Sequence, residues 1–233
     1  MTKKILFFIF INIFSLSSIC AESAKTKLLP LPKEEKLSYE IKLGQLYLGN
    51  AEFVYKGQVK IDNEVLNFMT FEAQTLNFLD KEKIYSHPEN LLPIRIEREV
   101  VTLFKKEEIK EDYDQKKFIL TILKKNGNNE EKMSIKKNAP IHNAILFPHY
   151  LRRIPNLKIG SIFNINLPNR QLKLKLVSID KIRLFQKTFT AFYFKSTNNE
   201  IKIWISTDQR RLPLKIEANA GFGYSLVLKE YSS

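Results

Sequence analysis

The 233-residue chain contains 17 phenylalanines and 9 tyrosines, so it is long enough and apolar enough to bury a sizeable core. Its formal net charge of +13 is typical of proteins with an anionic partner, but the lysines are scattered on the solvent side of alternating strands, as in residues 172–176, which favours a solvated face. Because no nucleic-acid-binding motif accompanies that charge, we expect anionic lipid or polysaccharide rather than nucleic acid. The only cysteine is Cys20, which excludes an intramolecular disulfide, a cysteine nucleophile and a cysteine-based zinc site in the folded domain.

Residues 1–21 have the three parts of a secretory signal peptide. Two lysines precede an apolar run over residues 5–14, and small residues follow up to Ala21. The run is short for a spanning helix, which needs about 20 apolar residues. We therefore predict cleavage after Ala21 and export to the periplasm. The alternative is cleavage before Cys20 with lipid attachment, which would give a membrane-anchored lipoprotein.

Residues 22–36 contain two prolines and mixed charge, which predicts a tether. We predict that residues 37–233 form a single domain. In its first half, β-like runs alternate with short polar breaks. Such short connections favour antiparallel neighbours, because parallel pairing needs longer crossovers. The predicted strands of this half are residues 37–43, 47–55, 65–76, 91–104, 118–124 and 132–136.

One segment, residues 138–154, has the spacing of a helix. Asn138 is a candidate cap, Pro140 fits a first turn, and apolar side chains recur from Ile141 onward. Pro148 would then lie in the helix interior, where proline removes a hydrogen bond and crowds the preceding turn. We therefore expect a short kinked helix, or two short helices.

The second half is organised around a predicted β-hairpin over residues 201–217. In its first strand, three isoleucines alternate with polar residues and Trp204, so the tryptophan lies on the opposite face. Asp208 supplies turn chemistry, and Pro213, which lacks a ladder donor, predicts an edge strand or a bulge. The other predicted strands of this half are residues 162–167, 171–179, 188–195 and 223–231.

These elements predict an α+β fold that is mostly β: a strongly curved antiparallel sheet or open barrel, with one short kinked helix packed against it. Several strands are apolar on both faces. In residues 188–195, for example, Phe192 and Phe194 lie on one side and Tyr193 on the other. Either ordinary packing covers both sides of the sheet, or the concave side lines a groove for an apolar ligand.

No residue pattern predicts catalysis, a metal site or a cofactor. The three histidines are dispersed, whereas zinc sites use three or four ligands. Ser206 and Asp208 have no histidine nearby, and the carboxylates of residues 107–114 are typical of a solvated surface. Neither a phosphate loop nor a dinucleotide-binding glycine pattern occurs. We therefore predict no catalytic and no metal-binding residues, and an enzyme is the least favoured class.

A set of short motifs runs through the domain, and the tryptophan-to-aspartate hairpin is the most specific of them. The motifs are Leu37–Ile41, Leu92–Glu97, His149–Arg152, and Ile203–Asp208 with Arg211–Glu217. With them the chain resembles, over roughly residues 37–231, a family of exported bacterial proteins catalogued as domain of unknown function 3108.

The resemblance implies an envelope location and a curved antiparallel sheet similar to that of the lipoprotein-localisation carriers, and it brings no established activity. It points to Arg152, Trp204 and Asp208. For each of them a structural role is the competing interpretation: Arg152 pairs with a carboxylate, Trp204 fills the sheet interior, and Asp208, with Pro213, shapes the hairpin.

The predicted function is binding: a periplasmic carrier or accessory factor for a lipid-like or acylated molecule in envelope maintenance. Its predicted ligand-binding residues are Phe192, Phe194, Trp204 and Arg152. The alternative is an envelope scaffold or interaction protein that docks on anionic lipid or polysaccharide. A continuous apolar cavity under the helix would favour the carrier, and a filled core would favour the scaffold.

Overall fold

The computed structural model describes residues 28–219 and 223–233. The predicted signal peptide, residues 1–21, lies outside these ranges, as does most of the predicted tether. Within the described ranges, no helix is both long and apolar enough to cross a membrane.

In the described part of the chain, fourteen antiparallel strands form a single sheet, which one helix accompanies. The first meander comprises β1 (Glu35–Leu43), β2 (Leu46–Ile61), β3 (Glu64–Thr75), β4 (Phe78–Ser86), β5 (Pro93–Thr102), β6 (Lys106–Asp114), β7 (Ile119–Asn126) and β8 (Asn129–Lys136). After helix α1 (Leu146–Leu151), the second meander comprises β9 (Ile162–Asn166), β10 (Gln171–Leu184), β11 (Lys187–Ser196), β12 (Ile201–Ser206), β13 (Pro213–Ala218) and β14 (Tyr224–Ser232).

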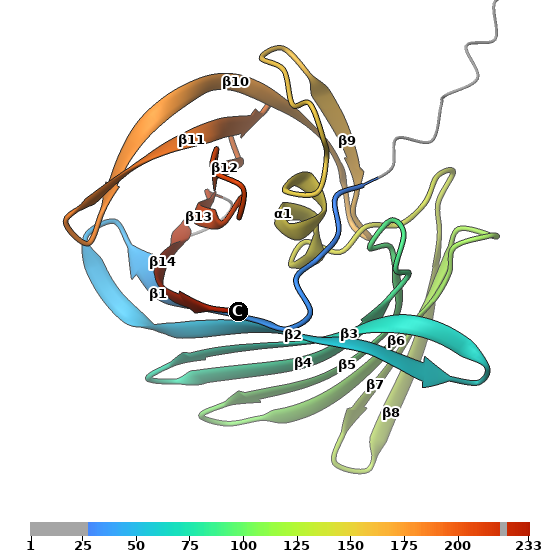
Figure 1. The fold of residues 1–233 in the computed structure, drawn as a ribbon. Coiled ribbons are helices and arrows are strands. Elements are labelled where there is room, and N and C mark those ends of the chain that lie inside the picture. The colour runs from blue at the N-terminus through green and yellow to red at the C-terminus, as the bar shows by residue number, and fades with distance from the viewer. Residues whose placement is uncertain (1–27, 220–222) are drawn as a thin grey trace, which may run out of the picture.

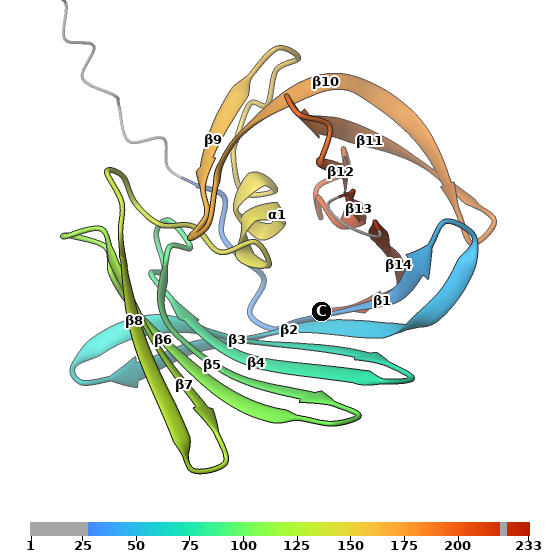
Figure 2. The ribbon, with the colours of Figure 1, turned by 180° about the vertical axis from the view of Figure 1, so that it is seen from behind.

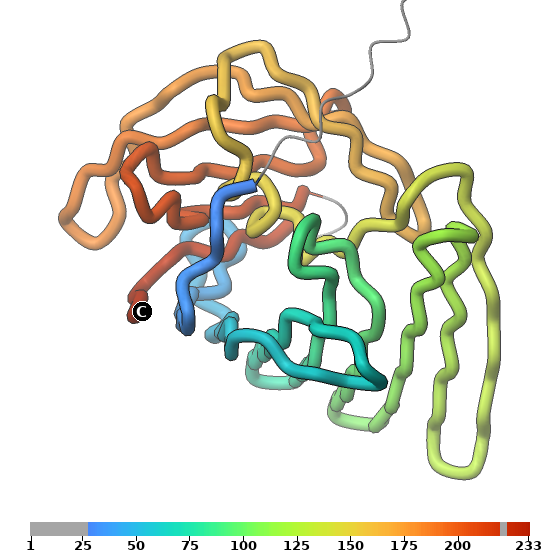
Figure 3. The backbone as a smooth tube through the Cα atoms, turned by 45° about the vertical axis from the view of Figure 1, so that its right-hand side comes forward, coloured from blue at the N-terminus to red at the C-terminus, as the bar shows by residue number. Residues whose placement is uncertain are grey.

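The two meanders join through the pairing of β1 with β14, so the first and last strands lie side by side in the middle of the sheet. Its two edges are β8 and β9, which flank the helix in sequence. In the tube view, the first meander runs from the blue strand β1 to the yellow-green hairpin β7–β8 on the far side (Figure 3). The sheet curls strongly but does not close, which confirms the predicted antiparallel sheet of the open-barrel type.

Helix α1 lies inside the curve of the sheet (Figures 1 and 2) and packs against two apolar clusters. Phe147 and Leu151 contact a cluster that includes Phe194 and Ile203. On the other cluster, the His149 ring stacks on Phe53 with 3.6 Å between ring centroids. The helix therefore fills the concave side of the sheet with apolar side chains.

The helix is shorter than the segment predicted for it. Asn143 caps it, since its side-chain oxygen accepts hydrogen bonds from the backbone N–H groups of Ile145 and Leu146 at 2.8 and 3.1 Å. Asn138, the predicted cap, precedes an irregular stretch. Because the helix begins at Leu146, Pro148 lies in its first turn, where a missing backbone N–H is tolerated, and not in the interior position from which a kink was expected.

Strands β4 and β6 were missed by the sequence analysis. Both carry lysine and glutamate at alternate positions, which imitates a solvated loop. Their pattern is nevertheless that of strands, since Asp80, Glu82 and Ile84 are buried on one face of β4. Glu35, predicted to belong to the tether, is a buried residue of β1 because an arginine neutralises its charge.

The predicted hairpin is present as β12 and β13. Ile203 lies opposite Ile216, and a register shift after Trp204 places Ile205 opposite Pro213. Strand β13 has hydrogen-bonded neighbours on both sides, so Pro213 is accommodated by a bulge, and the edge-strand alternative is wrong.

Candidate functional site

Arg152, at the end of α1, is held by a buried ion pair. Its guanidinium donates two hydrogen bonds to the Glu35 carboxylate, at 2.5 and 2.9 Å, and a third to the backbone carbonyl of Arg210 at 2.6 Å. Both side chains of the pair are almost fully buried. Arg152 therefore ties the helix to β1 and to the β12–β13 loop.

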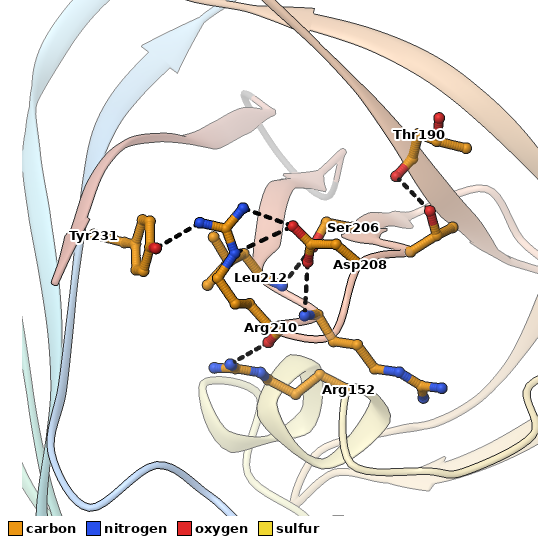
Figure 4. A network of polar contacts seen from close by, with 9 residues as sticks. Arg152, Thr190, Ser206, Asp208, Arg210, Leu212 and Tyr231 are labelled. Carbon is orange, nitrogen blue, oxygen red and sulfur yellow. Dashed lines mark hydrogen bonds and ion pairs between the residues drawn. The ribbon is translucent and has the colours of Figure 1, made fainter. Parts of the chain in front are cut away.

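Asp208 organises that loop (Figure 4). Its carboxylate accepts hydrogen bonds from the Ser206 hydroxyl at 2.8 Å, from the Arg210 guanidinium at 2.7 and 3.2 Å, and from the backbone N–H of Arg211 at 3.2 Å. Burial raises the pKa of Asp208, but the hydrogen bonds from Arg210 and Ser206 outweigh it and leave the pKa below its ordinary value. Arg210 also donates to the Tyr231 hydroxyl at 2.5 Å, which connects the loop to β14.

The aromatic residues predicted to bind a ligand lie on both faces of the second meander. Phe194 is completely buried in the cluster beside the helix. Phe192 is half-buried there, with the Arg211 guanidinium 5.7 Å from its ring centroid. On the opposite face, Trp204 stacks on Tyr193 with 4.8 Å between centroids. These contacts are packing contacts within the protein. The three aromatic residues and Arg152, which were predicted to bind a ligand together, therefore do not lie in one common site.

A second buried polar cluster lies in the first meander and was not predicted. Arg98 donates to both oxygens of Asp80, at 2.7 and 2.5 Å, and its Nε lies 3.4 Å from a Glu82 oxygen. Burial raises the pKa of Glu82 to about 8, because the opposing effect of Arg98 is smaller, and the nearby charges of Asp80 and Glu111 add to the rise. At neutral pH this cluster therefore holds a protonated carboxyl beside an ion pair.

An open groove of about 960 Å³ crosses the first meander. Two rows of directly paired residues form its walls. The first row runs from Lys36 on β1 to Leu123 on β7 through Thr70, Lys83, Glu97 and Lys110. The second row comprises Glu52, Glu72, Lys81, Glu99, Glu108 and Lys125.

These rows alternate along each strand with the buried core residues, so the groove, which we call the outer groove, lies on the sheet face opposite the core. Several side chains in these walls form ion pairs with each other. Lys36 lies 2.5 Å from Glu52, and Lys81 lies 3.4 Å from Glu72. Both members of each pair remain well exposed to solvent. The outer groove therefore offers positive and negative groups along its length, beside apolar residues such as Val54, Ile109 and Leu123.

The described residues contain no cluster of histidine, cysteine and carboxylate side chains that could hold a metal ion. The Ser206 hydroxyl donates to Asp208 and accepts from the backbone N–H of Leu212 at 2.8 Å, so it serves the loop. His149, a buried residue of α1, has a pKa well below its ordinary value because burial disfavours its charged form. Neither side chain is arranged with a partner as a nucleophile and base are.

No curated protein matches the chain. Among solved structures, the chain is similar to the crystal structure of a beta-barrel-like protein of domain of unknown function DUF1849 from Brucella abortus, at 8% sequence identity and a TM-score of 0.49. That match covers 88% of this chain and 98% of the other.

The family model described as "Protein of unknown function (DUF3108)" matches residues 38–229, and these residues include nearly the whole sheet, the Arg152 clamp and the Asp208 loop. The chain therefore belongs to the DUF3108 family, as its hairpin motif predicts.

Proposed function

We propose that the protein is a non-enzymatic binding protein of the cell envelope that holds an extended, charged polymer along the outer groove. The observation that supports this proposal is the groove itself, whose two rows of lysine and glutamate side chains cross the first meander. The export predicted from residues 1–21 would bring the groove to the envelope.

The length of the outer groove favours a polymer over a small molecule. Its first row crosses from β1 to β7, which is six strand spacings or about 29 Å at roughly 4.8 Å each. Such a groove accommodates several units of a chain laid across the strands. Its open form also suits a polymer, because a polymer enters and leaves from the side, whereas small ligands are usually enclosed.

The charges of the groove favour a polymer that carries both amino and carboxylate groups. Lysines predominate in the first row and glutamates in the second, so a ligand between the rows meets opposite charges on its two sides. Exposed ion pairs contribute only about 0–1 kcal/mol each, so a ligand replaces the internal pairs at little cost. Peptidoglycan, a polysaccharide with peptide branches, has this chemistry.

Titration with soluble peptidoglycan fragments tests the proposal. We expect saturable binding that weakens with salt, and a loss of about tenfold in affinity in the double variant Lys83→Glu, Lys110→Glu, because each reversal opposes a ligand carboxylate. The matched control is Lys173→Glu with Lys175→Glu on β10, which makes the same change in net charge at two exposed positions outside the groove. Equal losses in both variants would reject the groove as the site.

A lipid carrier is the second candidate, and the apolar cluster that α1 covers supports it. The helix has only six residues and lies over the apolar cluster that contains Phe194 and Ile203. Acyl chains would have to displace Phe147 and Leu151 to reach that cluster. Saturable uptake of a fluorescent fatty acid, abolished in a Phe192→Arg variant that remains folded but retained in Trp204→Arg on the opposite face, would favour the carrier over the scaffold.

A further inference from the structure

The turns at one end of the first meander carry large apolar side chains that contact little of the protein. In an antiparallel meander, successive turns alternate between the two ends of the sheet, so β1–β2, β3–β4 and β5–β6 turn at the same end. Their tips follow one another along the left and lower side of Figure 1. They bear Leu46, Leu76, Leu103 and Phe104, which we call the apolar rim.

Exposure of the apolar rim is close to complete at two of its positions. Leu76 is 92% exposed and Phe104 is 95% exposed. Tight turns usually consist of glycine, asparagine, aspartate or proline, and none of their conformational requirements calls for leucine or phenylalanine. Exposed apolar side chains grouped in one region mark an interaction site.

The opposite end of the same strands provides an internal comparison. There the β2–β3 turn is Asp62-Asn63, the β4–β5 loop exposes Glu89 and Asn90, and the β6–β7 turn exposes Lys116. Both ends are built from the same strands and turn in similarly short connections. The large apolar side chains are therefore concentrated at three of the four turns of one end, and the fourth turn of that end, β7–β8, is Gly127-Asn128.

Lysines flank the apolar rim, and a further exposed aromatic ring lies near it. Lys105 and Lys106 follow Phe104 directly, and Lys42 lies at the β1–β2 tip with its Nζ 5.8 Å from the ring centroid of Phe185. These lysines contact neighbouring glutamates, as Lys106 does Glu99 at 2.9 Å. Such exposed pairs are weak, so an anionic surface competes for the lysines effectively.

We propose that the apolar rim inserts into the head-group region of an anionic lipid bilayer while the flanking lysines contact lipid phosphates. Apolar side chains beside lysines are the combination that binds at the boundary between head groups and acyl chains. A fluid partner also fits the spacing of the rim. Consecutive tips are two strands apart, about 10 Å, so each tip of the grouped rim can insert separately between lipid head groups.

Vesicle co-sedimentation tests the proposal with the chain from Glu22 onward, which keeps every residue that the structure describes. We expect binding to vesicles of phosphatidylethanolamine with phosphatidylglycerol and much weaker binding to phosphatidylcholine. The double variant Leu76→Ser, Phe104→Ser should bind the anionic vesicles at least about tenfold more weakly, because both side chains lose their apolar burial. Lys105→Gln with Lys106→Gln should reduce only the salt-dependent part.

The matched control is Val65→Ser with Ile162→Ser, which removes two exposed apolar side chains that lie outside the apolar rim. We expect this variant to bind vesicles as the wild type does. A second measurement is the fluorescence of the variant Phe104→Trp. In buffer its emission should be that of a solvated indole, and anionic vesicles should shift the emission maximum to shorter wavelength. Wild-type protein that leaves the vesicles unbound, or equal binding by the rim variant and the wild type, would overturn the proposal.

This test is independent of the polymer proposed for the outer groove. Leu76 and Phe104 do not line the groove, so the rim variant should still bind peptidoglycan fragments, and the groove variant Lys83→Glu, Lys110→Glu should keep the rim intact. Loss of vesicle binding with polymer binding retained supports the rim alone. Retained vesicle binding in the rim variant rejects the rim whatever the groove does.

Discussion

Arg152 is the residue on which the contact between helix and sheet depends. Removing it leaves the Glu35 carboxylate buried without its partner, and breaking a buried pair in this way typically costs about 3–5 kcal/mol. We therefore expect Arg152→Ala to lower the free energy of unfolding by that amount in chemical denaturation. Arg210→Ala is the control, because Arg152 contacts only the backbone carbonyl of Arg210. Equal losses for the two variants would contradict the role assigned to the buried pair.

Glu82 should make stability depend on pH in the opposite direction from an ordinary carboxylate. Its pKa is about 8 in the folded state against 4.5 ordinarily, so between these values the folded state keeps a proton that the unfolded state has lost. Stability then falls as pH rises from 4.5 to 8, by at most about 1.4 kcal/mol per pH unit from this group.

The variant Glu82→Gln tests this by removing the titration. Denaturation at pH 6 and pH 9 should show a smaller loss of stability for Glu82→Gln than for the wild type. Glu97→Gln, an exposed position on β5, is the control and should keep the wild-type slope. An unchanged slope in Glu82→Gln would show that Glu82 is ionised in the folded protein at neutral pH.

Trp204 is only partly buried, which lowers the loss of stability expected when its side chain is removed. The indole is half-buried, stacks on Tyr193 and lies under Lys215, whose Nζ is 5.2 Å from the ring centroid. Fully buried aromatic residues cost about 3–5 kcal/mol on truncation to alanine. We expect Trp204→Ala to cost about 1–3 kcal/mol by denaturation, below that range, and a loss under about 0.5 kcal/mol would place Trp204 among unpacked surface residues.

At the scale of elements, Gly49 is the tightest point of the first meander. A Cβ at this position would lie 2.0 Å from the backbone oxygen of Gln74, so any other residue must separate β2 from β3. We expect Gly49→Ala to destabilise the protein by more than about 2 kcal/mol, as measured by thermal or chemical unfolding.

Gly44→Ala is the comparison for Gly49→Ala. A Cβ at Gly44 meets no atom within 4 Å, and only its left-handed backbone, with φ of +60°, opposes alanine. This cost is about 1 kcal/mol. A Gly49→Ala variant no less stable than Gly44→Ala would contradict the close approach of β2 and β3.

The elements that the sequence predicted well are those whose apolar side chains alternate. The hairpin around Trp204 and the strands on its two sides follow from the alternation of apolar and polar residues alone. Strands β4 and β6 do not, because Asp80 and Glu82 occupy core-facing positions and their burial depends on Arg98, which is 18 residues from Asp80 in sequence. The helix start was misplaced because Asn138 and Asn143 are both acceptable caps, and only tertiary packing selects between them.

The contacts of the candidate site are likewise predictable only where the partners are close in the sequence. Asp208 was predicted to hold its turn because its partners Ser206 and Arg210 are two residues away. The partner of Arg152 is Glu35, 117 residues away, and no local pattern identifies it. The outer groove consists of residues from seven strands, so its two rows appear only once the strand registers are known.

At the scale of the whole molecule, the outer groove and the apolar rim have a defined relation. The rim lies at the ends of strands, and the groove runs across them. If the rim rests on a bilayer, the strands stand on the membrane and the groove runs parallel to its surface. The protein would then hold an envelope polymer alongside the membrane, which is the task of a scaffold.

Methyl NMR of the labelled protein distinguishes a ligand bound in the outer groove from a ligand bound under the helix. Val54 and Leu123 line the groove, whereas Leu151 and Ile203 belong to the apolar cluster at the helix. Addition of peptidoglycan fragments should shift the Val54 and Leu123 methyl signals in a saturable way and leave those of Leu151 and Ile203 in place. Shifts confined to the methyl signals of Leu151 and Ile203 would show that the ligand binds under the helix and not in the outer groove.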